Sequence, residues 1–366
     1  MNQTTRIISV LMIAAMAILS SCASIGPGNI TRDRFDYTAA VADSWKSQML
    51  LNLVKIRYGD TPVFLDVGQI VAGYSFQRNL GATAGAKLYD DGPGPNAEIG
   101  SFGLAVGGTL NDSPTVTYSP MAGERFARSL MMPIPPSVIL NLIQAGSPVE
   151  EVFRTSVQSI NGVDNRRIGR LYVRRANPEF YAILPNLERL QLSGDIGMRV
   201  QQVGQEAKLL MIFRPRIAAA EENALRNTAK ILGLDLNARE FQVVYGNVAS
   251  SDKEIALLTR SIYEILTDIA SYINVPEVHV TERRVRPTTE GDMGPDGPVP
   301  PLIRITSAIE RPADAFVVVP YNGYWFFIDN RDLPSKQMFS SIMFLFTFVE
   351  TGSKEAAPIL TIPTTR

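Results

Sequence analysis

The sequence has 366 residues, of which 45% are hydrophobic and 19% are charged, and its 35 basic and 36 acidic side chains give a formal net charge of −1. This length accommodates one large or two medium globular domains, and the apolar fraction is enough for a buried core, so a disordered or collagen-like chain is excluded. A chain without excess positive charge lacks the electrostatic surface with which proteins hold phosphate backbones, so we expect no nucleic-acid partner.

Cysteine and histidine each occur once, as Cys22 and His279. A single cysteine excludes a disulfide bond within the chain, and this pair alone cannot make a cysteine-rich or multi-histidine zinc site. Carboxylates, hydroxyls or lysines would have to carry any catalysis. We therefore predict that the protein is not an enzyme, with no catalytic residues, no metal site and no cofactor.

The first residues, 1–21, have the pattern of an export signal, with Arg6 followed by an apolar run from Ile7 to Leu19. This run is shorter than the roughly 20 residues that a membrane-spanning helix needs, which predicts cleavage. The tetrapeptide Leu19–Cys22 resembles the lipobox of bacterial lipoproteins, and this resemblance implies that Cys22 is acylated. An ordinary signal with a chance cysteine is the alternative interpretation.

The residue after Cys22 is Ala23 and not the Asp that retains enteric-type lipoproteins in the inner membrane, so the resemblance implies the outer membrane. Acyl chains contribute roughly 0.8 kcal/mol per buried CH₂, which makes such an anchor essentially permanent. Membrane lipid is thus one expected partner, held through acylated Cys22, with residues 22–32 as the lipidated tether. The body could face the periplasm or the cell exterior.

After the tether, apolar residues at helical spacing predict a helix from Asp33 to Tyr58. Residues 66–112 instead alternate between apolar and small or polar residues, with a Gly/Pro-rich tip at Asp90–Asn96. This pattern predicts a long amphipathic β-hairpin.

The middle of the chain alternates predicted helices with predicted strands. The predicted helices cover 136–145, 178–193, 221–232 and 252–273, and the predicted strands cover 196–203, 207–213 and 240–245. Pro185 is expected to kink the second of these helices.

A stretch rich in Pro and Gly, Pro287–Pro301, predicts a flexible loop or linker. Beyond it we expect a strand over 302–307, a hairpin turned by Asn322–Gly323, and a helix over 335–351 that is too short to span a membrane and is either a core helix or an oligomer contact. The predicted fold class is α+β, mainly antiparallel sheets with packed helices. The expected organisation is a body over 33–286 that includes hairpin 66–112, with a C-terminal hairpin and hydrophobic helix over 302–366 packed on it.

One stretch has the Ser-x-x-Lys spacing of penicillin-recognising enzymes, namely Ser250–Lys253. The accompanying Ser-Asp-Asn and Lys-Thr-Gly elements are absent from the chain, and Ser251 with Glu254 fits a helix capping box. We therefore favour capping over catalysis here.

Other candidate groups also have simpler explanations. We interpret His279 as a solvated or hydrogen-bonded residue in a strand over 278–280, and the aromatic run Tyr321–Phe327 as part of the core more than as a sugar platform. The acidic pairs are ascribed to turn and loop solvation because none follows the ligand loop of a calcium site; they are Asp90–Asp91, Asp292 with Asp296, and Asp329 with Asp332. Arg331 could bridge the carboxylates of the last pair.

Three segments together resemble a set of uncharacterised bacterial lipoproteins. They are Ser44–Pro62, Tyr321–Asp332 and Pro358–Pro363. This resemblance implies a location in the cell envelope and carries no assigned catalytic residues.

The expected function is that of a non-enzymatic outer-membrane lipoprotein, acting as a structural or assembly component that binds other envelope proteins or its own copies. The alternative is an oligomeric secretion or pore lipoprotein, similar in architecture to the curli-export lipoprotein, in which residues 66–112 contribute a transmembrane β-hairpin. An envelope hydrolase and a ligand-binding protein are weaker alternatives.

The anchor gives the first testable prediction. Replacing Cys22 by Ser should abolish acylation and leave either an uncleaved precursor or a soluble form, because the acceptor thiol is gone. Incorporation of labelled palmitate measures this directly, and equal incorporation into wild type and variant would refute the assignment.

Overall fold

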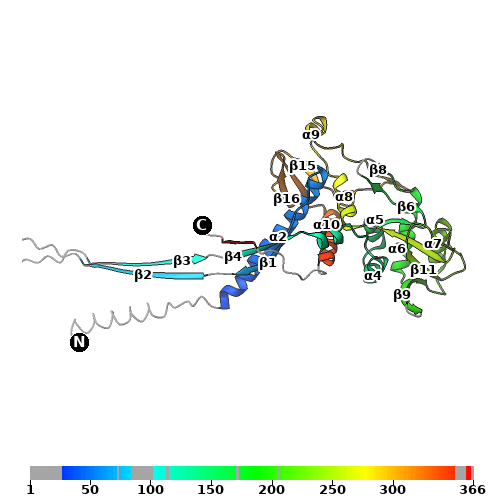
Figure 1. The fold of residues 1–366 in the computed structure, drawn as a ribbon, viewed down its shortest axis with the longest axis horizontal. Helices are drawn as coiled ribbons and strands as arrows, with labels where there is room; N and C mark the ends of the chain where they lie inside the picture. Colours follow the sequence, from blue (N-terminus) through cyan, green and yellow to red (C-terminus); the bar gives the residue numbers. More distant parts are fainter. Residues whose placement is uncertain are drawn as a thin grey trace, which may run out of the picture. The chain divides into compact units, whose positions relative to one another are not determined.

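The computed structural model describes residues 27–71, 74–84, 102–112, 115–169, 173–203, 206–350 and 360–363. Helices and mainly antiparallel sheets alternate along the chain, which confirms the α+β class (Figure 1). Contacts divide the chain into two compact units. The first unit comprises Met1–Ala42, Leu65–Pro120 and Ala356–Arg366, and the second comprises Asp43–Phe64 and Met121–Glu355.

The long N-terminal helix α2 (Pro27–Arg57) begins earlier than the expected Asp33. Proline suits the first turn of a helix because its fixed φ is already helical and its missing N–H has no intrahelical acceptor there. The second part of the expected tether 22–32 is therefore helical. The helix ends as predicted, at a turn in which Gly59 adopts a φ of 78°.

The first unit contains two small sheets. One has the order β1-β4-β18, from β1 (Phe64–Val71), β4 (Thr115–Met121) and β18 (Leu360–Pro363), in which β4 and β18 are antiparallel. The other is the predicted hairpin, formed by β2 (Tyr74–Ala84) and β3 (Phe102–Asp112). The expected tip at Asp90–Asn96 lies outside the described residues.

The register of β2 and β3 is continuous and antiparallel over all 11 residues of each strand. Because residues directly opposite one another share a face of the sheet, each face can be read from the pairs. One face carries mainly apolar pairs, Phe76↔Leu110, Leu80↔Val106, Ala82↔Leu104 and Ala84↔Phe102, and the other carries polar or small pairs, Ser75↔Asn111, Gln77↔Thr109, Asn79↔Gly107, Gly81↔Ala105 and Thr83↔Gly103. The strand pairing thus places most of the apolar residues of both strands on one face and the small or polar residues on the other.

The second unit is built around a six-stranded sheet with the order β6-β5-β12-β11-β10-β9. Its strands are β5 (Val157–Ile160), β6 (Val163–Asp164), β9 (Ile196–Val203), β10 (Glu206–Phe213), β11 (Glu240–Tyr245) and β12 (Glu254–Thr259). The strands β11 and β12 are parallel, and every other neighbouring pair is antiparallel. The predicted β9–β10 hairpin and the predicted strand 240–245 are confirmed.

Helices lie against this sheet and against one another. The helix α4 (Pro136–Gln144) contacts β9, β11 and β12, and α5 (Val149–Ser156), α6 (Pro178–Leu192) and α7 (Ala219–Ile231) pack in series. Pro185 lies inside α6. The predicted helices at 136–145, 178–193 and 221–232 are confirmed to within two residues.

A second group of elements contains the sheet β15-β17-β16, formed by β15 (Thr306–Ala308), β16 (Ala315–Tyr321) and β17 (Tyr324–Asp329). Asn322 and Gly323 have φ angles of 47° and 83°, as a two-residue hairpin turn with positive φ at both positions requires, so the predicted turn is confirmed. The remaining helices are α3 (Glu124–Met131), α8 (Ile262–Ser271), α9 (Glu277–Thr281) and α10 (Leu333–Glu350), and the short strands are β7 (Arg167–Ile168), β8 (Val173–Arg174), β13 (Met293–Gly294) and β14 (Gly297–Pro298).

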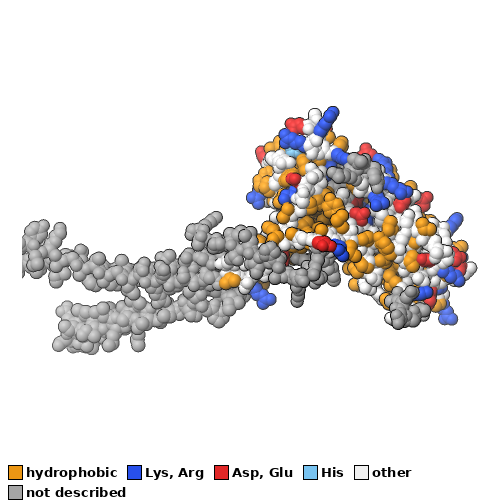
Figure 2. All heavy atoms as spheres, in the orientation of Figure 1, with side chains coloured by type: hydrophobic (Ala, Val, Ile, Leu, Met, Phe, Trp, Pro, Cys, Tyr) orange, Lys and Arg blue, Asp and Glu red, His pale blue; other side chains and the backbone are white. Residues whose placement is uncertain are grey.

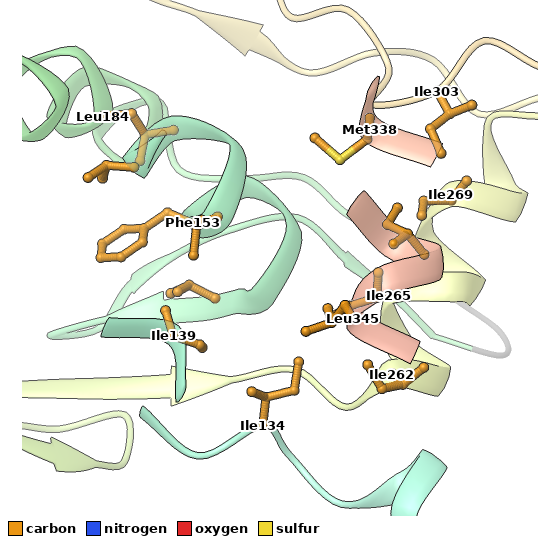
Figure 3. Packing of buried hydrophobic residues seen from close by; sticks show 14 of the residues in the cluster. Ile134, Ile139, Phe153, Leu184, Ile262, Ile265, Ile269, Ile303, Met338 and Leu345 are labelled. Atoms are coloured by element: carbon orange, nitrogen blue, oxygen red, sulfur yellow. The ribbon is translucent and has the colours of Figure 1, made fainter. Parts of the chain in front are cut away.

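A single apolar core joins these elements of the second unit. Figure 3 shows Ile262, Ile265 and Ile269 of α8 together with Met338 and Leu345 of α10 as members of this core. Of the two alternatives left open by its sequence, a core helix or an oligomer contact, α10 takes part in the core through Met338, Phe339, Ile342, Leu345 and Phe346. Burying a large aliphatic side chain contributes about 1.5–3 kcal/mol, which makes this cluster the main source of stability.

The predicted helix over 252–273 is wrong, because its first part is the strand β12 and only its second part is helical, as α8. β12 is central in the sheet, and four of its six residues are buried while the other two are partly buried. A strand buried on both faces has a continuous apolar sequence, which periodicity cannot distinguish from a buried helix. The capping box lies at Ser261 and Glu264, where both reciprocal hydrogen bonds are present, and not at Ser251 and Glu254.

This difference gives a stability prediction. Ser261→Ala should destabilise the protein by about 1 kcal/mol, because the buried N-cap hydroxyl accepts the Glu264 N–H. Ser251→Ala is the matched control; we expect a change of less than about 0.5 kcal/mol, since Ser251 is exposed. Urea unfolding measures both free energies, and an equal loss in the two variants would contradict the structure.

Candidate functional site

The lipidation site expected from the sequence, Cys22, lies outside the described residues, as do residues 1–21 and the acidic pair Asp90–Asp91. Acylation of Cys22 therefore stays a prediction. The other candidates from the sequence lie in the second unit.

Ser250 and Lys253 do not form the arrangement of a serine nucleophile with a lysine one helical turn away. Both precede β12 in an irregular segment. The Ser250 hydroxyl donates to Glu254, and Lys253 Nζ lies 4.0 Å from Asp235 Oδ2. The segment that contains Ser250 and Lys253 is the connection between β11 and β12. Its contacts match neither the serine–lysine pair of a nucleophilic site nor a helix cap at Ser251.

His279 lies in the short helix α9, so the predicted strand over 278–280 is wrong. Its ring is buried, and a hydrogen bond of 2.7 Å joins its Nδ1 to the Tyr58 hydroxyl. Burial lowers the pKa of His279, with a further decrease from Arg284, and burial raises the pKa of Tyr58 to about 12. His279 is therefore hydrogen-bonded, as one of our two interpretations expected, but it lies on a helix and not on a strand.

The aromatic run Tyr321–Phe327 contributes to the same corner. Phe326 is fully buried, and its ring lies edge-on to Tyr58 with centroids 6.0 Å apart. The Tyr321 hydroxyl donates to Asp60 at 2.5 Å, and burial together with this bond raises the pKa of Tyr321 to about 12. The core role therefore holds for part of the run: Phe326 lies in the core, and Tyr321 and Tyr324 are partly buried and pack against it.

The polar corner at Asp329 and Asp332 is ordered by local bonds. The Arg331 backbone N–H donates to Asp329, its guanidinium lies 3.7 Å from Asp314, and Asp332 accepts bonds from the backbone and hydroxyl of Ser335. Asp332 thus holds the first turn of α10, which is a structural role.

The most unusual group in the second unit is a cluster of buried charges that the sequence analysis did not assemble. Arg166, Arg260 and Asp292 are each 2% exposed, and Asp268 is buried beside them. Asp292 was expected to be solvated in a loop, and that expectation is wrong for Asp292, although Asp296 is exposed. Lone buried charges are strongly unfavourable, so their pairing decides what the cluster does.

The pairing is partial. Arg260 Nη1 donates to Asp268 Oδ2 at 3.2 Å, and the Arg260 guanidinium also donates to the carbonyl oxygens of Arg154, Thr155 and Arg166. Arg166 Nη1 donates to the Tyr272 hydroxyl at 2.6 Å and to the Glu290 carbonyl at 2.8 Å. Burial raises the pKa of Asp268, and the two arginines oppose that shift.

Local structure places each of these groups. Arg260 follows β12 directly and Asp268 lies on the buried side of α8. The Asn165 side chain donates to the carbonyl oxygens of Arg154 and Val157, which holds the backbone just before Arg166. One feature of the sequence could have indicated these buried charges, namely a charged residue next to apolar ones. Arg260 follows the segment Ile255–Thr259, and Asp268 lies in the segment Leu266–Ile269.

A pocket of about 240 Å³ opens at the edge of this cluster, lined by Arg166, Val173, Arg175, Thr289 and Glu290. Arg175 and Glu290 form an exposed ion pair of 2.7 Å at this pocket. On the face of the molecule drawn in Figure 2, basic and acidic side chains are interspersed over the described surface. The combination of a pocket and a buried guanidinium makes this the candidate binding site of the second unit.

Among the described residues, no cluster of three or more His, Cys, Asp or Glu side chains could hold a metal ion. None of the described helices is both long and apolar enough to cross a membrane. Comparisons with protein-family models, curated proteins and solved structures found no match to this chain.

The buried cluster gives a third prediction. Arg260→Met should cost about 3–5 kcal/mol, because it removes the hydrogen bond to buried Asp268 and the hydrogen bonds to three carbonyl oxygens. The matched control is Arg128→Met in the exposed Glu124–Arg128 pair, where we expect at most about 1 kcal/mol. Chemical denaturation of both variants tests this; similar small losses would show that the cluster does not stabilise the fold.

Proposed function

We propose that this protein is a lipid-anchored component of the bacterial outer membrane that acts in assembly and not as an enzyme, and that the β2–β3 hairpin is its contact element. The hairpin carries this proposal, because its two strands pair with one another in a sheet of their own, among the described residues. An isolated two-stranded hairpin is marginally stable in water. A hairpin with one apolar face therefore needs a further surface to cover that face.

The covering surface is, in our proposal, a second copy of the chain. Among the residues whose burial is described, every member of the apolar cluster lies within the second unit, which therefore has a core of its own. Each strand of the hairpin also has a second edge, and an edge strand carries unpaired N–H and C=O groups that recruit another strand. Two copies could satisfy both requirements at once, by pairing edges and covering apolar faces.

Strand length favours the alternative function, an oligomeric secretion or pore lipoprotein whose residues 66–112 contribute a transmembrane hairpin. The two strands have 11 residues each, and a membrane-crossing strand takes about 9–11. One apolar face toward lipid and one small or polar face toward water is also the arrangement that such strands need. Arg78, which pairs with Gly108 on the mainly apolar face, weighs against this alternative.

Two substitutions on opposite faces of β3 test the proposal. Leu104→Asp places a carboxylate on the apolar face, and Ala105→Asp places the same carboxylate on the small, polar face. In the full-length acylated protein in detergent, we expect wild type and Ala105→Asp to form oligomers and Leu104→Asp to be monomeric, as measured by light scattering. Monomers in all three proteins would refute self-assembly through the hairpin.

Two further measurements separate the remaining explanations. If the hairpin is independent of the core, Leu104→Asp should melt within a few degrees of wild type, whereas a large loss would mean that the core covers Leu104. Reconstitution into liposomes with a trapped dye tests the alternative function. Leakage with wild type that Leu104→Asp abolishes would favour the pore, and intact liposomes with oligomeric wild type would favour assembly.

A further inference from the structure

We propose that the pocket at Arg166 binds the oxyanion group, carboxylate or phosphate, of a small molecule. The starting observation is Arg166, whose side chain is almost completely buried and which is one of the residues that line the pocket. Its Nη1 donates two hydrogen bonds and lies 3.8 Å from Asp292, and its Nε lies 3.6 Å from Asp268. Its Nη2 is itself buried and has no hydrogen-bond acceptor among the described residues.

A buried charged donor without an acceptor is rare, because the lost hydration is not replaced. The guanidinium itself is held firmly, since it lies over the Tyr272 ring with 4.4 Å from Cζ to the ring centroid and is bonded to the Tyr272 hydroxyl. A fixed guanidinium donor is well suited to carboxylate and phosphate oxygens, with which it forms short, charge-assisted hydrogen bonds. A ligand that enters the pocket beside Arg166 and carries an oxygen acceptor would supply the hydrogen bond that Nη2 lacks.

The rest of the pocket agrees with this chemistry. Arg175 offers a second guanidinium and Thr289 offers a hydroxyl, whereas Glu290 is the one acidic residue among the five described lining residues. Glu290 forms an exposed ion pair with Arg175 at the rim of the pocket. An entering anion would compete with Glu290 for Arg175, so this exposed pair would limit affinity without being needed for the fold.

The competition allows a test with substitutions of opposite effect. Arg175 and Glu290 are 63% and 83% exposed, so neither Arg175→Gln nor Glu290→Gln should affect folding. We expect Glu290→Gln to bind anions about threefold to fivefold more tightly than wild type and Arg175→Gln to bind them more weakly by a similar factor. Glu124→Gln removes the same charge from an exposed pair elsewhere and should bind as wild type does.

The measurement is isothermal titration calorimetry of the full-length protein with inorganic phosphate and, separately, with acetate, at constant ionic strength. Preference for one probe distinguishes a phosphate site from a carboxylate site. Absence of binding for both probes in wild type and in Glu290→Gln would overturn the proposal. Equal affinities of Glu290→Gln and Glu124→Gln would also overturn it, because the effect would then come from net charge alone.

Discussion

The buried pair of Arg260 and Asp268 is the constraint on which the organisation of the second unit depends. Arg260 directly follows the central strand β12, and its guanidinium also donates hydrogen bonds to the last turn of α5 and to the backbone at Arg166. One side chain thus ties together the sheet, a helix that flanks it and the segment that leads to β7. Because a guanidinium can bond only along fixed directions, it fixes the relative positions of these elements in a way that aliphatic packing alone does not.

This arrangement also explains why the same region carries the candidate binding site. Two arginines and two carboxylates are buried together here, and not all of their polar atoms form hydrogen bonds. Among the described residues, Asp268 and Asp292 each keep one oxygen without a donor, and Arg166 keeps Nε and Nη2 without an acceptor. The cluster stabilises a connection between elements, yet it leaves polar groups unsatisfied next to a pocket. A purely apolar core would have no such residual capacity for hydrogen bonding.

Local patterns predicted much of the fold. Helices bounded by Pro and Gly, such as α4 and α6, and the Asn322–Gly323 hairpin were predicted because their signals lie within a few residues of each other. The strand β12 was not, because its identity comes from its neighbours β11 and β5, which lie elsewhere in the sequence. The candidate site was missed for the same reason, since Arg166, Arg260, Asp268 and Asp292 are brought together only by the tertiary fold. The acylation of Cys22 stays a prediction, and it could be made from sequence because a lipidation signal is read along a linear segment.

The uninterrupted register of the β2–β3 hairpin has a consequence for how this element can change in length. Since successive residues alternate between faces, inserting one residue into β2 would exchange the two faces from that point onward. Inserting two residues into each strand would preserve both faces and extend the hairpin by roughly 7 Å. Insertions or deletions of two residues in each strand can therefore change the length of the hairpin without exchanging its faces. Each such change would suit the hairpin to a partner of a different size or to a bilayer of a different thickness.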